Sequence, residues 1–339
     1  MAKADTSYDL ITLGRISMDL FSQNVGADFV DIKGFDASIG GSPSNIALGS
    51  SRLGMRVALL TAVSEDNVGK FVLSHLQNGG VETKYIPFKP NTRTGLAILG
   101  VQPPDQFPLV FYRDNPADIY LTIQDVVATP ISQSRALLLS GTALSRGSCR
   151  DATLFAAELA NANGVPTFMD LDLRPDQWDH PQSCGTSIRS ILPLLDVVIG
   201  TEEEFYASLA TNSEGVMLGK MVTDAQREEL EDLVRAMLVQ TQGPEAWVLK
   251  RGEHGVSIYL RDGSTVSAAG FQVEIVNTVG AGDAFASGLI YGYLKGWGWH
   301  KCARMGNACG AIVVSRHGCA AALPYEQEVH DFVTERGGF

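Results

Sequence analysis

Near the C-terminal end of the chain, small residues and one carboxylate are arranged as in a site for an anion. Residues 277–283 (NTVGAGD) follow a β-branched run, and apolar residues then recur at helical spacing over 285–293. Gly280 and Gly282 let the backbone bend sharply and bring its N–H groups close to a ligand. The start of a helix also presents unpaired N–H donors and a partial positive charge. The stretch therefore predicts an anion site, above all for phosphate.

Asp283 puts a carboxylate beside this predicted site, where it would repel a phosphate unless it had a chemical task. One such task is to take a proton from a hydroxyl that attacks phosphorus. The plain alternative is a glycine-rich helix start whose acidic residue suits the helix dipole. The stretch alone leaves both interpretations open. An aspartate with the reference pKa of about 3.9 is ionised at pH 7, so we expect no special tuning of Asp283.

A second group of small and polar residues lies at 40–45 (GGSPSN). Ser42 fits a helix N-cap with Pro43 at the first helical position. The two preceding glycines suggest that a ligand approaches the backbone closely. Asn45 offers both a donor and an acceptor to a polyol. A tight loop followed by a well-capped helix is the alternative.

Polar or glycine-rich clusters follow several apolar runs that predict buried strands. Arg15 and Asp19 follow the run at 8–13, and further clusters lie at 170–174 (DLDLR), 200–204 (GTEEE) and 250–255 (KRGEHG). Open α/β sheets bind ligands at the carboxyl ends of their strands. Asp19 is suited to sugar hydroxyls and Arg15 to an acid group. Each cluster also has a plain structural role open to it, as surface charge, helix-dipole partner or turn.

The chain alternates predicted strands and helices, which favours βαβ units and a parallel sheet. Predicted strands lie at 8–13, 55–63, 136–140, 165–169, 196–199, 246–249 and 256–260. Predicted helices lie at about 42–53, 67–79, 149–162, 185–193, 202–209, 224–240, 282–295, 300–315 and 325–335. Residues 20–38 and a hairpin of 94–101 with 109–112, joined across a proline-rich turn at 102–105, predict a small accessory sheet. We find no internal repeat or linker and expect one domain over residues 1–339.

The composition excludes several classes of protein. The net charge of −12 argues against a nucleic-acid or anionic-membrane partner, and 45% hydrophobic residues indicate a well-filled core. The five cysteines show no CxxC spacing, which favours free thiols in a reducing cytoplasm. No P-loop, HExxH or GxGxxG motif in the first βα unit is present. No signal peptide or membrane span is expected, so the predicted location is the cytoplasm.

Taken in order along the chain, these residues resemble the ribokinase-like (PfkB) carbohydrate kinases. Gly40-Gly41 with Asn45, and Gly280-Ala281-Gly282-Asp283, match the two signature regions of that family. The resemblance implies a three-layer α/β/α sandwich with a mostly parallel central sheet. It also implies a small β-sheet lid over the sugar, formed by about 16–38 and 92–115.

The residues at 107–118, 170–175 and 200–204 resemble members of the family that phosphorylate the 6-hydroxyl of a keto-deoxy sugar acid in myo-inositol catabolism. The 2-keto-3-deoxygluconate kinases and other PfkB sugar kinases remain alternatives. A nucleoside kinase is disfavoured by the arginines suited to an acid, and a non-catalytic sugar-binding protein by the intact Gly-Ala-Gly-Asp. The expected partners are a small sugar acid and ATP.

Carried over position by position, the resemblance implies roles for three groups of residues. Asp283 is the expected catalytic base, with the backbone amides of Gly280, Ala281 and Gly282 as the anion hole. The expected sugar contacts are Asp19, Arg15, Gly40, Gly41, Asn45, Arg113 and Arg174. The expected nucleotide contacts are Lys250, Gly252, Gly255, Asn307 and Thr201, and Glu204 is expected to organise Mg²⁺ through water.

The sequence departs from the family pattern at two positions. Thr201 stands where the family's Asn-x-x-Glu element usually has Asn, which puts metal and phosphate handling there in doubt. Asn277 stands where the second signature usually begins with Asp, a K⁺ ligand in cation-dependent members. K⁺ activation is therefore doubtful. Exposed edge strands in the lid favour a homodimer that forms through the lids.

Overall fold

The computed structural model describes residues 7–103, 107–239 and 242–339. Pro104 and Asp105 of the predicted turn lie outside the described residues, as does residue 240 of the predicted helix over 224–240. The statements below concern the described residues only.

Within these ranges the larger sheet has nine strands, in the order β13-β12-β11-β10-β9-β8-β1-β4-β5. The parallel strands are β1 (Leu10–Leu13), β4 (Val57–Leu60), β5 (Val81–Glu82), β8 (Leu137–Ser140), β9 (Thr167–Asp170), β10 (Val197–Thr201) and β11 (Ala246–Lys250). The antiparallel strands β12 (Val256–Leu260) and β13 (Thr265–Ala268) complete one edge. Because both faces are covered, the central strands read as continuous apolar runs.

Helices cover both faces of this sheet, as the side chains of β1 illustrate. Leu10 packs into the core formed with α1 (Ser42–Arg52), α2 (Asn67–Asn78), α9 (Ala281–Leu294), α10 (Trp299–Val314) and α11 (Glu326–Thr334). Its neighbour Ile11 packs into the opposite core, formed with α3 (Ile123–Val127), α4 (Ser148–Ala162), α5 (Pro181–Ile191), α6 (Glu202–Leu209), α7 (Glu214–Met217) and α8 (Asp224–Leu238). The predicted α/β/α sandwich is confirmed.

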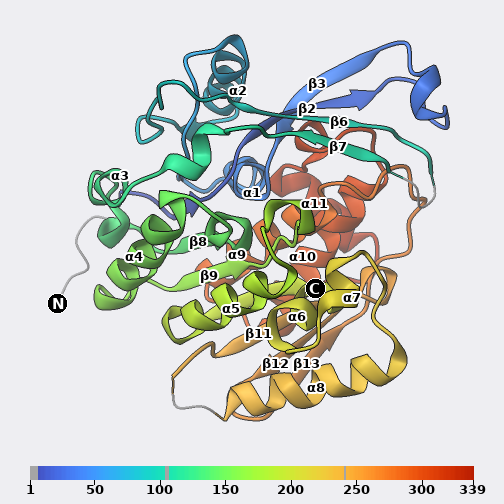
Figure 1. Ribbon diagram of the computed structural model, residues 1–339. Helices are drawn as coiled ribbons and strands as arrows, with labels where there is room; N and C mark the ends of the chain where they lie inside the picture. Colours follow the sequence, from blue (N-terminus) through green and yellow to red (C-terminus); the bar gives the residue numbers. More distant parts are fainter. Residues whose placement is uncertain (1–6, 104–106, 240–241) are drawn as a thin grey trace.

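A smaller sheet lies apart from the sandwich, at the top of Figure 1. In the part of the chain that the structure describes it has four strands, in the order β3 (Phe35–Gly40), β2 (Ser17–Ser22), β6 (Gly95–Leu99) and β7 (Leu109–Tyr112). β2 and β6 are parallel, and the outer pairs are antiparallel. The predicted accessory sheet is therefore present, and β6 with β7 forms the predicted hairpin.

The start of α1 differs from the prediction by one residue. The N-cap is Gly41, with φ 101°, and Ser42 is the first helical residue. The Ser42 hydroxyl donates to Asp170 Oδ2 (2.9 Å) instead of capping the helix. The predicted cap was wrong because the glycine takes the backbone angle that the entry to the helix requires, which frees the serine for a contact with β9.

Two further features concern the chain as a whole. All five cysteines lie within the described ranges, where each is a buried free thiol, as predicted. Among the helices of the described residues, none is both long and apolar enough to cross a membrane.

Candidate active site

The carboxyl ends of β1, β8, β9, β10 and β11 meet at one edge of the large sheet, because these strands are parallel. The predicted polar clusters follow β1, β9, β10 and β11 at this edge. The N-terminus of α9 reaches the same edge, since Asp283 and Lys250 are close enough to affect each other's charge. The topology thus brings together residues that are far apart in the sequence.

Asp283 lies in the first turn of α9, directly after the turn formed by Gly280. Gly280 is the N-cap and has the left-handed φ of 87°. The Asn45 side-chain amide of α1 donates to Asp283 Oδ2 at 2.8 Å. The two signature regions, 238 positions apart, therefore meet at this carboxylate.

The environment of Asp283 raises the pKa of its carboxyl to about 7. Burial is the largest cause, followed by the negative charges of Asp170 and Asp172, while the hydrogen bond from Asn45 and the nearby Ser42 hydroxyl lower the pKa. The expectation of an ordinary, fully ionised aspartate at pH 7 is therefore wrong. The sequence did not reveal that three carboxylates share this edge of the sheet.

The turn before α9 is held from two sides. Asn277 is fully buried, its amide nitrogen donates to the Gly318 carbonyl (3.0 Å), and its Oδ1 accepts from the Val279 N–H (3.0 Å). A Cβ built on Gly280 would overlap the sulfur of Cys319. The backbone at the predicted anion hole is therefore fixed by Gly318 and Cys319, which lie after the end of α10.

On the lid side, Asp19 of β2 is buried and accepts a hydrogen bond from Ser17 (2.7 Å). Burial raises the pKa of its carboxyl, and the charges of nearby arginines lower it. Any side chain at Gly40 would overlap the Asp19 carboxylate, and a Cβ on Gly41 would lie 2.5 Å from the Arg15 carbonyl oxygen. The two glycines of the first signature are thus needed for close approach within the protein itself.

Arg15 and Arg174 share the carboxylate of Asp172. Arg15 Nε lies 3.1 Å and Arg174 Nη2 3.2 Å from its two oxygens. Burial raises the pKa of Asp172, but the two arginines outweigh it and bring that pKa to about 2. The Arg174 side chain is 37% exposed, and its Nε is buried and has no hydrogen-bond partner among the described residues. Arg174 therefore keeps capacity to bind an anion.

Arg113 makes more hydrogen bonds within the protein than Arg174 does. Its two Nη atoms donate to the two Asp118 oxygens at 3.0 and 2.7 Å, and its Nε donates to Gln177 at 3.0 Å. Asp118 also accepts from the Ile16 N–H (3.1 Å). This bidentate pair ties the end of β7 to the start of β2 and leaves Arg113 less free than Arg174.

Lys250, at the end of β11, pairs in register with Thr201 at the end of β10. Thr201 is the N-cap of α6 and forms a capping box with Glu204. The Glu204 carboxylate accepts from the Thr201 N–H (2.8 Å) and from the Leu173 N–H (3.1 Å). Threonine thus caps this helix at the position where the sequence departs from the family pattern.

The predicted nucleotide residues fall into two groups. Gly255 and Asn307 both contact the end of β13, where Asn307 Nδ2 donates to the carbonyls of Ala268 (3.1 Å) and Ala269 (3.0 Å). Gly252, with φ 55°, has open space at its Cβ position. Lys250 belongs to the other group, beside the strand-end carboxylates.

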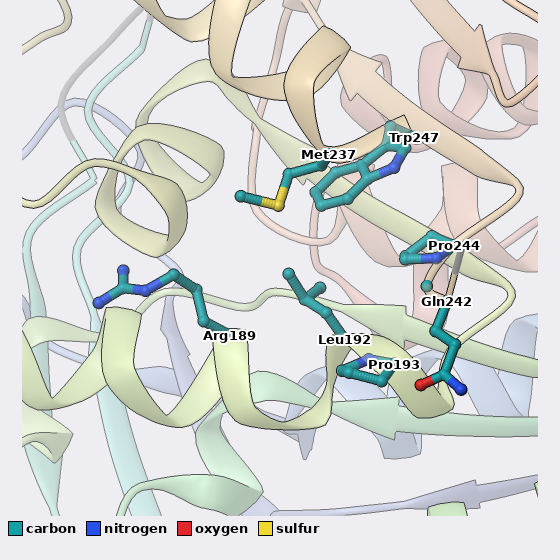
Figure 2. Close-up of a pocket in the computed structure, with 8 residues that line it drawn as sticks. Arg189, Leu192, Pro193, Met237, Gln242, Pro244 and Trp247 are labelled. Carbon is teal, nitrogen blue, oxygen red and sulfur yellow. The ribbon is translucent and has the colours of Figure 1, made fainter. Parts of the chain in front are cut away.

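The chain also holds a separate cavity of about 210 Å³ between α5, α8 and the start of β11 (Figure 2). Met237 and Trp247 line it from one side and Leu192 and Pro193 from the other. It lies at the amino end of β11, whereas Lys250 lies at the carboxyl end. None of the predicted site residues lines it, so it is distinct from the candidate active site.

Asp170 and Asp172 lie at the end of a predicted strand, but the sequence alone assigns them no role. Their position after a buried strand was the available signal. Cys319 had no such signal, because a lone cysteine near the C-terminus does not indicate its contact with Gly280.

Comparisons with known proteins agree with this geometry. The family model described as "pfkB family carbohydrate kinase" matches residues 8–326. The chain is 33% identical over 326 residues to a 5-dehydro-2-deoxygluconokinase of Geobacillus thermodenitrificans, covering 96% of this chain and 93% of that protein.

Two solved structures share the fold. One is a proposed Ribokinase II from E. coli in complex with ATP and Mg²⁺ (TM-score 0.79, 22% identity, 96% of this chain and 99% of that one). The other is a double mutant of a Vibrio cholerae fructokinase with fructose, ADP and potassium ion bound (TM-score 0.77, 23% identity, 97% and 99%). With the match of the family model over nearly the whole sequence, the chain belongs to the pfkB family of carbohydrate kinases and is a sugar kinase.

Proposed function

We propose that this kinase transfers the γ-phosphoryl group of ATP to the 6-hydroxyl of 5-dehydro-2-deoxy-D-gluconate. The observation that carries the proposal is the position of Asp283, which Asn45 orients beside the backbone N–H groups at the start of α9. The name of the Geobacillus relative supports the substrate, and the ATP complex of the E. coli neighbour supports the donor.

The proposed step is an in-line displacement. The sugar hydroxyl oxygen forms a bond to the γ-phosphorus, the bond from that phosphorus to the bridging oxygen breaks, and ADP leaves with the electron pair. The hydroxyl proton passes to Asp283. The amides of Gly280, Ala281 and Gly282 stabilise charge on the transferred group. Positioning and charge stabilisation supply most of the rate, because the transition state is loose.

The carboxylates at the strand ends fit a magnesium ion bound mainly by phosphates and water. Glu204 and Asp170 lie together around Lys250, and no group of three acidic, His or Cys residues among the described residues forms a protein-only metal site. Mg²⁺ typically takes one or two carboxylates and keeps several waters. Glu204 and Asp170 would hold it through water, and the bound ion would neutralise charge on the phosphates.

The substrate carboxylate needs a cation that has donors to spare. Arg174 best meets this requirement, because it is partly exposed and its Nε has no partner in the part of the chain that the structure describes. Arg15 lies beside it on the shared Asp172. We propose that Arg174 binds the acid group, that Arg15 supports it, and that Arg113 shapes the lid end of the site.

We propose further that residues 1–339 form one kinase domain and that the small sheet, over about 16–38 and 92–115, acts as a lid. Asp19 and Gly40 would then contact sugar hydroxyls from the lid side. Lid closure would exclude water, which otherwise competes with the sugar as acceptor.

The residues present do not fit a potassium ion at Asn277. A cation there would need oxygen ligands, but the Asn277 amide directs its NH₂ group at the Gly318 carbonyl. We therefore propose that the kinase works without K⁺, although the structure of the fructokinase neighbour has a potassium ion bound.

The deciding experiment compares kcat/KM for 5-dehydro-2-deoxygluconate and 2-keto-3-deoxygluconate, with isotopic phosphate traced from ATP into the sugar. We expect label on the first sugar and a higher kcat/KM for it. Asp283→Asn should lower kcat by roughly 10²- to 10⁴-fold and keep ATP binding. Asp232→Asn, an exposed change on α8, is the matched control.

Each alternative has its own outcome in this experiment. A higher kcat/KM for 2-keto-3-deoxygluconate would show that this compound, and not 5-dehydro-2-deoxygluconate, is the preferred substrate. Sugar binding without any label transfer would indicate a binding protein. Near-normal kcat in Asp283→Asn would remove that residue as the base.

A further inference from the structure

The side chain of Lys250 lies against the start of α9, although its place in the chain is at the end of β11. Its Nζ is 3.4 Å from Asp170 Oδ1 and 3.8 Å from Glu204 Oε2, and the side chain is 13% exposed. A Cβ built on Gly282 would lie 3.1 Å from this Nζ. The ammonium group is therefore next to the backbone of the first helical turn, where Asp283 also lies.

Lys250 stays charged in this position. The carboxylates of Asp170 and Glu204 lie 3.4 and 3.8 Å from its ammonium nitrogen, and Asp283 lies in the same first helical turn as Gly282. Three carboxylates thus face one lysine. Without this cation, the carboxylates of Asp170, Glu204 and Asp283 would repel an incoming phosphate at this point of the sheet edge.

The ammonium group also has donor capacity left. Charge-assisted N–H···O bonds are typically about 2.7–2.9 Å long, whereas both carboxylates of Lys250 lie farther away. A lysine carries three N–H donors. The carboxylates of Asp170 and Glu204 therefore hold the ammonium group in place but leave it able to donate another hydrogen bond. An anionic oxygen beside Gly282 could accept that bond.

We propose that Lys250 is a catalytic residue whose ammonium group contacts an equatorial oxygen of the phosphoryl group during transfer. The assignment rests on the proposed function, because it takes the anion hole at 280–282 as the place of transfer. Lys250 supplies a full positive charge on one side of that hole, next to the backbone amides. Asp170 and Glu204 hold its position. This role differs from the nucleotide contact that the sequence suggests, since Gly255 and Asn307 contact a different segment, the end of β13.

The test compares Lys250→Met with the matched control Lys70→Met, which removes an exposed lysine from α2. The readouts are the single-turnover transfer rate and the Kd for ATP, measured at pH 8.5 so that Asp283 is ionised. Loss of one preorganised electrostatic group is expected to slow transfer by roughly 10²- to 10³-fold. The Kd for ATP should change by less than about fivefold, and the control should match the wild type.

Lys250→Met leaves Asp170 and Glu204 without their cation, so the variant can lose stability for that reason alone. The double variant Lys250→Met with Asp170→Asn removes one of the two unpaired charges. Because Asp170 is also a proposed magnesium ligand, the double variant is compared with Asp170→Asn alone. We expect it to regain thermal stability and to transfer roughly 10²- to 10³-fold more slowly than Asp170→Asn. Recovery of the transfer rate together with stability would assign Lys250 a purely structural role and overturn the proposal.

A transition-state mimic gives a readout with its own control for folding, because ADP affinity is measured on the same protein with and without the mimic. Aluminium fluoride with ADP and the sugar acid should raise ADP affinity in the wild type. In the Lys250→Met variant the gain in ADP affinity caused by aluminium fluoride should be at least about tenfold smaller. The affinity of this variant for ADP alone should be normal. An unchanged increase, or a weakened ATP Kd with an unchanged transfer rate, would overturn the proposal.

The wild type separates this proposal from the proposed function. If the wild type does not phosphorylate the sugar acid, the proposed substrate is wrong. The Lys250 comparison is then made with the sugar that the wild type accepts, and its outcome decides on Lys250 independently.

Discussion

The base strength of Asp283 is set by its neighbours. Burial favours the neutral acid, the charges of Asp170 and Asp172 add to that effect, and the hydrogen bond from Asn45 and the nearby Ser42 hydroxyl oppose it. The resulting pKa of about 7 makes this carboxylate a far stronger base than an ordinary aspartate. A base with a pKa near the working pH is well matched to proton abstraction.

This environment predicts the pH dependence of the reaction. As the proposed base, Asp283 accepts a proton only when it is ionised, so kcat/KM should be high above its pKa and fall as the pH drops through about 7. Asp170→Asn removes a negative neighbour and frees Lys250, and both changes lower the pKa of Asp283. The midpoint of the kcat/KM profile should therefore move to lower pH. An unmoved midpoint would show that another group controls the profile.

Asn277 fixes the turn before Asp283, because its side-chain amide bonds to both the Val279 N–H and the Gly318 carbonyl. We expect equal kcat in K⁺ and Na⁺ at matched ionic strength. Asn277→Asp replaces the buried donor with a carboxylate, which leaves a charge facing the Gly318 carbonyl and invites a cation. That variant should lose activity in Na⁺ and regain part of it in K⁺. Activation of the wild type by K⁺ of tenfold or more would contradict the assignment.

At the scale of elements, the proposed anion hole depends on how α9 begins. Gly280 takes a left-handed φ of 87°, and Cys319 fills the space that a side chain would need. Two requirements therefore fall on one residue: a backbone angle that L-residues disfavour, and the absence of a Cβ. The same helix ends with another left-handed glycine, Gly296, whose Cβ position is open.

These two glycines give a matched pair of variants. Gly280→Ala must displace Cys319 and shift the turn, so we expect a loss of transfer rate of at least about 100-fold, as for a lost oxyanion donor. Gly296→Ala meets only the backbone preference, about 1–2 kcal/mol, and should keep full activity. Thermal unfolding and steady-state rates separate the two effects. Equal activity of both variants would mean that the turn tolerates the shift.

Much of this element structure could be predicted from the sequence, and the reasons are local. Apolar runs mark β1, β9, β10 and β11, and the boundaries of α6 match the prediction residue for residue. The alternation of strands and helices predicts the parallel sheet and the meeting of strand ends. Gly280 and Asp283 stand out because glycines directly before a helix, followed by a carboxylate, are the residues that an anion site with a base requires.

What could not be predicted depends on contacts between distant segments. The pKa of Asp283 depends on Asp170 and Asp172, which lie more than a hundred residues earlier in the chain. The fixation of Arg113 by Asp118 and Gln177 likewise depends on the tertiary arrangement. A sequence pattern specifies which residue types are present, whereas pKa values and free donors follow from packing.

At the scale of the whole molecule, the lid sheet has two unlike faces. Asp19 and Ser17 of β2 are buried on the side that carries the site. Leu20, Ile98 and Val110 are in register across β2, β6 and β7 and form a row on the opposite face. Val110 is 41% exposed. Both edges of the sheet, β3 and β7, are also free within the described residues, and free edges favour pairing with another strand.

An apolar sheet face with open edges predicts self-association through the lids. We expect the wild type to sediment as a particle of twice the 36.4 kDa chain mass. Val110→Glu puts a charge into the apolar row and should raise the Kd for dissociation of the dimer by tenfold or more. Leu218→Glu, at a position 69% exposed next to α7, is the matched control and should leave the mass unchanged.

Because a partner lid would order Asp19 as well as cover the row, the monomeric variant should show a raised KM for the sugar. A wild type that sediments at the single-chain mass would mean that the row is covered by something other than a second copy.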